Sequence, residues 1–280
     1  MSEPVFLFDD SDPAMQQAYE AARQSFKFLW RELSWERRRI VPALDMHMVK
    51  LPFTDEPLSD GKLEFEHMWV GDVEFDGITL AGTLINSPNW LRSVKQGDSV
   101  NAPFSYLTDW MMVADGKAYG GHTVNLMRSR MSASERRAHD GAWGLDFSDP
   151  AIVRVELEGG EQPKRGALSK LFGSKSGASA VAGFFDHPMC VNMVPKIEEQ
   201  LQQDRKPATS TDDRGWTMLH MEALAGNLGV VKLLVRYGAG IDAKTPDGRD
   251  AAALALGIGW SEIAAYLSNE ARTEPRANFS

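Results

Sequence analysis

Hydrophobic residues near the start of the chain recur at alternating steps of four and three positions. They are Met15, Tyr19, Ala22, Phe26, Leu29 and Leu33. This spacing places them along one side of an α-helix. Asp12 offers a capping carboxylate, and Pro13 suits the first helical position. The pattern predicts an amphipathic helix of about 20 residues that begins at Pro13.

From Leu44 the hydrophobic period changes from helical to alternating. Strand patterns occupy the stretches 44–52, 64–73, 78–84 and 100–113. Asp76-Gly77 is a strong hairpin signal. Ser132 and Glu135 have the spacing of a capping box, which predicts a short helix to about His139. Residues 1 to 150 are therefore expected to be α+β, with the N-terminal helix packed on a mostly antiparallel sheet of roughly four or five strands.

The last third of the chain carries a two-unit repeat. Gly215 and Gly248 are 33 positions apart. The same offset joins Gly226 to Gly259, Val230 to Ile263, and Leu234 to Leu267. A fixed period of this length is typical of stacked helix pairs. The second unit is degenerate, because Ala251-Ala252-Ala253 replaces Met218-Leu219-His220.

Two repeat units are fewer than the roughly three that usually bury a continuous core. The array is therefore expected to lean on another element. A helix around Pro195 to Gln203, with Ile197 and Leu201 facing inward, is the nearest candidate.

The first unit resembles an ankyrin repeat. The matching residues are Gly215, Thr217, Leu219, His220, Ala223, Gly226, Asn227, Val230, Val231, Leu233, Leu234, Gly238, Ala239 and Asp242. Met218 stands where that family usually has proline. The resemblance implies a scaffold that binds proteins, and it implies a structural role for His220 in the turn. The alternative is that the repeats only shield one face of the first domain.

The segment 14–147 resembles the YegJ-like bacterial domains of unknown function. The resemblance rests on Glu66-His67-Met68-Trp69-Val70, the stretch 82–88, Gly97-Asp98 and Asp109-Trp110. It implies a fold and no activity. Some members of this kind that carry repeats look like antidotes to interbacterial toxins. The resemblance therefore favours an immunity protein.

The composition divides the chain into five segments. We expect an α+β domain at 1–158, a basic Gly/Ser-rich linker at 159–183, a connecting segment with a helix at 184–212, ankyrin repeats at 213–270 and a polar tail at 271–280. The composition of this linker predicts a solvated segment. A segment that contacts phosphate is the alternative.

The charge balance and the cysteine count exclude several classes of protein. The formal net charge is −9, which disfavours binding to nucleic acid or to an anionic membrane surface and suits a basic protein partner. Cys190 is the single cysteine, so an intramolecular disulfide is impossible and an inert thiol is expected. No apolar run approaches the ~20 residues that span a bilayer. We expect a cytoplasmic location.

The candidate binding residues lie in the turns that open the repeats. They are Asp213, Arg214, Trp216, Thr245, Asp247 and Arg249. Trp and Arg dominate the energetics of many protein interfaces. We expect these turns, with the acidic first domain, to cover the active site of a toxin. A purely structural adaptor without inhibitory activity is the alternative, and the oligomeric state stays open.

An enzyme is the other alternative. The chain has no familiar catalytic or phosphate-binding motif, and no cofactor or metal is expected. Glu66, His67 and Asp109 could form an acid–base site if the fold brought them within hydrogen-bonding distance. A histidine on a strand beside Trp69 is more often a hydrogen-bonded structural residue.

Overall fold

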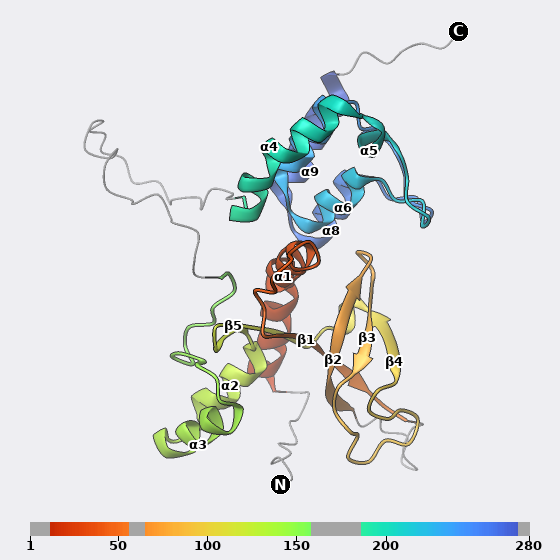
Figure 1. The fold of residues 1–280 in the computed structure, drawn as a ribbon. Helices are drawn as coiled ribbons and strands as arrows, with labels where there is room; N and C mark the ends of the chain where they lie inside the picture. The colour runs from red at the N-terminus through yellow and green to blue at the C-terminus, as the bar shows by residue number, and fades with distance from the viewer. Residues whose placement is uncertain (1–11, 56–64, 158–185, 274–280) are drawn as a thin grey trace, which may run out of the picture. The chain divides into compact units, whose positions relative to one another are not determined.

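The computed structural model describes residues 12–55, 65–157 and 186–273, and Figure 1 shows its elements. The chain divides into two compact units, residues 1–156 and 157–280, and each is described by itself. The linker expected at 159–183 lies outside the described residues. The α+β class with a helical C-terminal segment is confirmed.

The first unit begins with one long helix. Its elements are α1 (Pro13–Glu36), β1 (Met46–Phe53), β2 (Glu66–Phe75), β3 (Thr79–Leu84), β4 (Ser99–Pro103), the 3-10 turn η1 (Phe104–Tyr106), β5 (Asp109–Ala114), β6 (Lys117–Gly120), α2 (His122–Arg130) and α3 (Ala133–Trp143). The prediction for α1 is confirmed, since Asp12 accepts from the Ala14 amide at 2.9 Å and the six predicted apolar positions are buried. The capping box between Ser132 and Glu135 opens α3 as predicted.

The strands form one antiparallel sheet in the order β4-β3-β2-β1-β5-β6. The described part of this unit therefore holds six strands, and the expectation of four or five was wrong. The single strand expected at 100–113 is divided, because η1 turns the chain from the β4 edge to the far side of β1. Neither β6 nor α2 was expected from the sequence.

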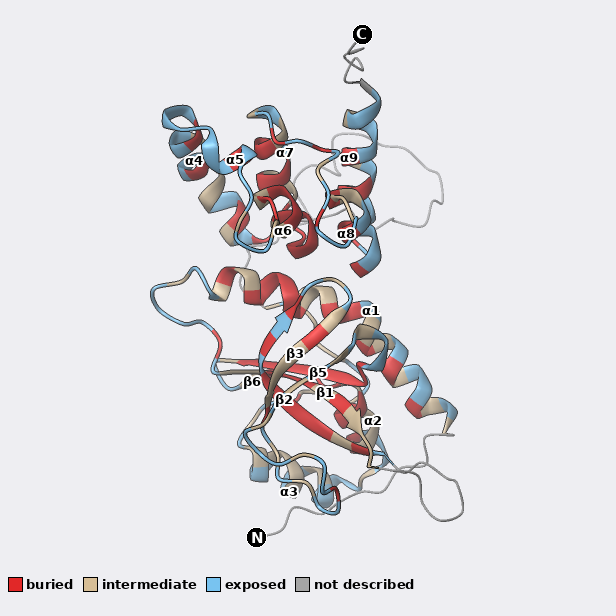
Figure 2. Cartoon of the chain, turned by 90° about the vertical axis from the view of Figure 1, so that its right-hand side faces the viewer, coloured by how far each residue is buried: buried red, intermediate tan, exposed pale blue. Residues whose placement is uncertain are grey.

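Helices cover both faces of this sheet. Met48 lies opposite Met111 in the register, and both belong to a buried cluster. The cluster also contains Trp69, Ala118, Val124 and Phe147. The neighbouring pair Val49 and Trp110 points the other way, because side chains alternate along a strand, and the Trp110 indole donates to the Ala22 carbonyl of α1 at 3.1 Å. Figure 2 shows that buried residues concentrate in these central strands.

A β-bulge interrupts β2. The register with β3 shifts between Gly71 and Glu74. Asp72, inside the shift, has a φ of 49°, a left-handed conformation that aspartate tolerates better than most residues. Gly82 of β3 lies so close that an added Cβ would be 2.2 Å from the Gly71 carbonyl oxygen. The bulge bends β2 and redirects the side chain of Asp72.

The second unit is helical in its described part. Its elements are α4 (Pro188–Gln203), α5 (Lys206–Thr209), α6 (Met218–Ala225), α7 (Leu228–Arg236), α8 (Ala251–Ile258) and α9 (Ser261–Thr273). The degenerate second repeat forms a helix pair like the first. The expectation that the array leans on a preceding helix is confirmed, because α4 packs against α7. That helix begins earlier than expected, at Pro188, where the His187 ring accepts from the Met189 amide and Pro195 lies inside the helix.

A tryptophan of the second repeat fits onto a glycine of the first. The Trp260 indole donates to the Leu224 carbonyl at 3.3 Å, and a Cβ on Gly226 would lie 2.3 Å from its ring. The aligned position in the first repeat holds Asn227, which donates to the buried Glu222 carboxylate at 2.7 Å. The two repeats therefore fill equivalent positions with different chemistry.

Candidate partner-binding surface

Each repeat opens with a turn that one side chain holds. In the first repeat, the Asp212 carboxylate accepts from the amides of Trp216 at 2.7 Å and Arg214 at 3.1 Å. In the second repeat, the Thr245 hydroxyl accepts from the Arg249 amide at 3.1 Å. Asp212 and Thr245 are 33 positions apart. The sequence period therefore places different side chains in the same structural role.

The turns expose charged residues at their ends. Asp213, Arg214 and Asp247 are exposed, and Arg214 pairs with Asp212 at 3.1 Å. The Arg249 side chain, 20% exposed, also pairs with the Asp247 carboxylate, its Nε donating at 2.7 Å. We call Asp213, Arg214, Asp247 and Arg249 the turn-tip surface.

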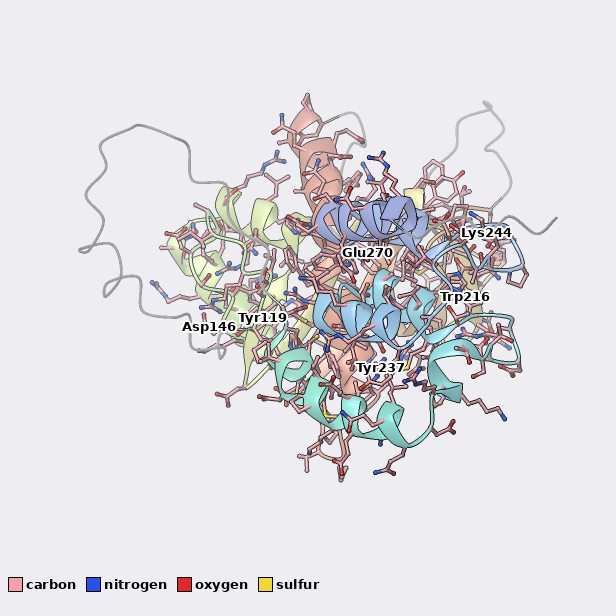
Figure 3. All side chains as sticks on the ribbon, turned by 90° about the horizontal axis from the view of Figure 1, so that it is seen from above. Tyr119, Asp146, Trp216, Tyr237, Lys244 and Glu270 are labelled. Atoms are coloured by element: carbon pink, nitrogen blue, oxygen red, sulfur yellow. The ribbon has the colours of Figure 1, made fainter. Side chains whose placement is uncertain are left out.

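The two turns are neighbours. A Cβ added at Gly215 would lie 3.0 Å from the Pro246 ring. Figure 3, in which Trp216 and Lys244 carry labels, shows both residues at the same end of the repeat helices. The exposed charges of the two turns therefore belong to one surface.

Two of the six predicted contact residues are buried instead. Trp216 is 9% exposed and Thr245 is 3% exposed. The Trp216 ring packs edge-on against His220, with the ring centroids 6.0 Å apart. The residue type alone predicted that Trp216 would be an exposed contact residue, whereas its side chain packs inside the repeat against His220. Both side chains hold the turns, and neither belongs to the turn-tip surface.

Hydrogen bonds keep the turn carboxylates charged. The Arg249 guanidinium, followed by the Thr245 hydroxyl, lowers the pKa of Asp247. Partial burial opposes ionisation of Asp212, but hydrogen bonds from the Trp216 amide and the Arg214 side chain hold its pKa below the usual value. These turns therefore present fixed charges at neutral pH.

His220 has the structural role that the ankyrin resemblance implied. Its Nδ1 accepts from the Thr217 amide at 3.0 Å, and the Thr217 hydroxyl accepts from the His220 amide at 3.3 Å. Its Nε2 lies 2.9 Å from the carbonyl oxygen of Ala243. The ring therefore connects the first helix of one repeat to the turn that leads to the next.

The alternative acid–base site is not assembled. Glu66 and His67 are adjacent on β2, so their side chains leave opposite faces of the strand. The Glu66 carboxylate accepts from the Asn89 side-chain amide at 2.6 Å. The His67 ring lies 3.2 Å from the Thr108 hydroxyl and stacks on Tyr19. Each residue has a separate structural partner.

Asp109, the third residue of that alternative, caps α2. Its carboxylate accepts from the amides of His122 at 2.9 Å and Thr123 at 2.8 Å. The Thr123 hydroxyl accepts from the Lys50 ammonium at 2.9 Å. Burial lowers the pKa of Lys50 and that of His122, and the Asp109 charge opposes both shifts. Ser25 on α1 completes the network through a 2.7 Å hydrogen bond with the His122 ring.

A cleft that the sequence analysis did not anticipate lies where β1 leaves β2. The two strands pair from Val49–Val70 to Phe53–Glu66, whereas residues 46–50 pair with β5. The cleft at this place is open to solvent and has a volume of about 630 Å³, within the range of small ligand sites. We call it the bulge cleft. Its lining comprises Glu36, Pro42, Leu44, Asp45, Met46, His47, Gly71, Asp72, Thr83, Leu84, Ile85, Gln96 and Gly97. A glycine inside a strand pattern is a bulge signal, so Gly71 could have indicated this place.

Neither the single cysteine nor the described helices and acidic or histidine side chains add a further candidate site. Cys190 is fully buried, and burial raises its pKa to about 12, in agreement with the expected inert thiol. Within residues 12–55, 65–157 and 186–273, no group of three or more His, Cys, Asp or Glu side chains could hold a metal ion. No helix in the same ranges is long and apolar enough to cross a membrane.

Comparison with known proteins agrees with this architecture. Residues 12–147 match the family described as "Uncharacterized protein conserved in bacteria (DUF2314)", and residues 214–246 match the ankyrin repeat. A protein of Neisseria meningitidis serogroup B, strain MC58, which is named as an ankyrin repeat protein, is 39% identical over 263 residues, covering 94% of this chain and 96% of the relative. The uncharacterized protein YegJ of Escherichia coli K12 is 30% identical over 81 residues, covering 29% of this chain and 49% of the relative. The chain belongs to the same family as this Neisseria ankyrin repeat protein, with a DUF2314 domain at residues 12–147 followed by an ankyrin repeat.

Proposed function

We propose that this protein binds and occludes a protein partner through its turn-tip surface, as an immunity protein that neutralises an interbacterial toxin in the cytoplasm. The ankyrin repeat indicates a role in protein–protein interaction. The identity of the partner as a toxin rests on the resemblance of repeat-bearing YegJ-like proteins to antidotes, and on charge.

The observation that carries the proposal is the construction of the two turns. Asp212 and Thr245 fix each turn by hydrogen bonds to backbone amides, while Asp213 and Arg214 stay exposed at the tip. Surfaces whose loops are already held lose little conformational entropy on binding. Turns that are held in place and carry exposed charges therefore suit contact with a partner.

Charge supports a basic partner. The chain has a formal net charge of −9, and complementary fields raise association rates between oppositely charged proteins. Toxins that act on nucleic acid need a basic active-site surface. A partner of that kind would be attracted to this chain, and occlusion of its active site would prevent access of its substrate.

Affinity capture with matched variants tests this proposal. The tagged full chain is expressed in its native cell beside D213A/R214A and beside K196A/E199A, which removes the same two charge types from exposed positions of α4. We expect one stoichiometric partner with the wild type and the α4 variant. At least about tenfold less of it is expected with D213A/R214A, because truncating interface hot spots costs about 2 kcal/mol or more and about 1.4 kcal/mol is tenfold in affinity. Equal recovery with all three chains, or recovery of no partner, would contradict it.

A second measurement separates inhibition from simple adaptor binding. The captured partner is produced with and without the chain, and its toxicity to cells is compared. Loss of toxicity only when the wild-type turn tips are present supports occlusion. Unchanged toxicity in the presence of a stable complex would leave an adaptor and remove the immunity function.

A further inference from the structure

The bulge cleft of the first unit carries negative charge. Three carboxylates line it, from Glu36, Asp45 and Asp72, and among its described lining residues there is no lysine or arginine. Burial lowers the pKa of His47, so its ring adds no positive charge at neutral pH. The cleft therefore repels anions and suits a cation.

The three carboxylates differ in their partners. Asp45 accepts from the Gly116 amide at 3.3 Å. Glu36 is engaged by Arg39 at 2.6 Å and by the amides of Ala43 and Leu44. Asp72 is exposed, and among the described residues its carboxylate has neither a hydrogen bond nor an ion pair. Its left-handed backbone at the bulge sets the direction in which that side chain leaves the strand. Bulges that redirect one side chain recur beside functional sites.

His47 lines the cleft without adding a charge or a competing ion pair. The buried Nδ1 of His47 has no hydrogen-bond partner among the described residues. Arg37, whose charge also acts on this ring, donates to the Val73 carbonyl at 2.7 Å and pairs with Glu74 at 3.0 Å. These contacts engage the Arg37 guanidinium outside the cleft lining.

An apolar edge borders the same cleft. Ile40 is 99% exposed and Val41 is 77% exposed, and they directly precede Pro42, which lines the cleft. Ile85 lines the cleft and is itself exposed. Exposed aliphatic side chains beside a cleft offer apolar surface to a segment that enters it. The alkyl stem of an arginine or lysine can pack on such an edge while its charged end reaches a carboxylate.

We propose that the bulge cleft binds an arginine or lysine side chain in a short segment of a partner protein, with Asp72 as the principal carboxylate and with flanking apolar residues of that segment on Ile40, Val41 and Ile85. Only the nature of the occupant, a partner protein, rests on the proposed function. The cleft belongs to the first unit, whereas the turn-tip surface belongs to the second.

Titration with small peptides tests the cleft by itself. The probes are acetyl-Leu-Arg-Leu-amide and its neutral isostere acetyl-Leu-citrulline-Leu-amide, added to the isotopically labelled full chain. We expect the arginine peptide to shift the backbone amide resonances of Met46, His47, Gly71 and Thr83 to saturation. The citrulline peptide should bind about two- to fivefold more weakly, because it lacks the charge and an exposed ion pair contributes up to about 1 kcal/mol.

Two variants with the same chemistry give the control. D72N removes the charge and keeps a residue that tolerates the left-handed backbone. D115N makes the same change at an exposed aspartate that also has a positive φ, 51°, in the turn between β5 and β6, outside the cleft lining. Binding that is about two- to fivefold weaker in D72N and unchanged in D115N supports the proposal.

Three results would overturn the proposal. They are equal binding of both peptides, equal loss of binding in both variants, and no resonance shifts with the arginine peptide. The peptides test the cleft alone and do not represent the partner of the turn-tip surface. A negative result with them would therefore leave the capture experiment on the repeats unaffected. Conversely, loss of capture by D213A/R214A has no bearing on Asp72.

Discussion

At Gly226, substitution by alanine should disrupt the packing between the two repeats. Its φ is 81°, and an added Cβ would lie 2.3 Å from the Trp260 ring, which is buried and bonded to the Leu224 carbonyl. G226A therefore combines a left-handed backbone penalty of about 1–2 kcal/mol with an overpacking penalty of about 1–3 kcal/mol. We expect the repeats to lose about 2–5 kcal/mol.

Gly238 provides a matched control. Its φ is 90°, and a Cβ there would meet no atom within 4 Å. G238A should therefore show only the backbone penalty of about 1–2 kcal/mol. The difference between the two variants isolates the contact with Trp260.

Hydrogen exchange measured by mass spectrometry suits this comparison, because it reports on α6 to α9 separately from the first unit. Each 1.4 kcal/mol corresponds to about tenfold faster exchange. The double variant G226A/W260L removes the ring, so the added cost of the alanine should fall to that of G238A. Equal effects of G226A and G238A in the wild-type background would refute the packing argument.

Three further predictions concern single groups. D109N should lower the melting temperature of the first unit by roughly 6–12 °C, because it leaves the α2 amides without a charged acceptor and Lys50 without a compensating charge, at a cost of about 3 kcal/mol. D115N should leave the melting temperature unchanged in the same scan. Cys190 should resist iodoacetamide at pH 8 and react once urea is added, since burial raises its pKa to about 12; fast labelling of the native chain would contradict this. Burial lowers the folded-state pKa of His47 and His122. The free energy of unfolding should therefore be highest above pH ~6.5 and fall as pH drops through the folded-state pKa values of these rings. H47N/H122N should make the melting temperature depend less on pH over this range, and an unchanged dependence in thermal scans would exclude these residues as its source.

Elements with local signals were predictable from the sequence. The helix at Pro13 combines a cap, a proline and a complete apolar stripe within one segment. The repeat helices combine a fixed period with glycines at both ends, so that even the degenerate unit at Ala251–Ala253 forms its helices.

Elements whose determinants come from elsewhere in the chain were missed. α2 has a glycine, Gly121, at its N-cap position, and its first amides are capped instead by Asp109, which belongs to β5. The sequence of the α2 segment alone therefore contains no capping residue that would predict the helix. The bulge cleft likewise arises where β1 and β2 separate, and the alternating strand pattern continues through these residues without a signal of that separation.

The candidate site was only partly predictable for a related reason. The repeat period located the turns, but exposure depends on packing across the turns. Trp216 is therefore buried against His220, while Asp213 beside it is exposed. W216A would consequently report on the stability of the turn, and D213A/R214A is the better test of contact.

Site-specific crosslinking tests the central claim most directly. A photoreactive benzoylphenylalanine replaces Asp213 in one chain and Glu199 of α4 in another, and both are irradiated in the native cell. We predict a single crosslinked partner from position 213 and none from position 199, because the turn tips contact the partner and the exposed face of α4 does not. A partner crosslinked from position 199 and not from 213, or no partner from either position, would contradict binding through the turns.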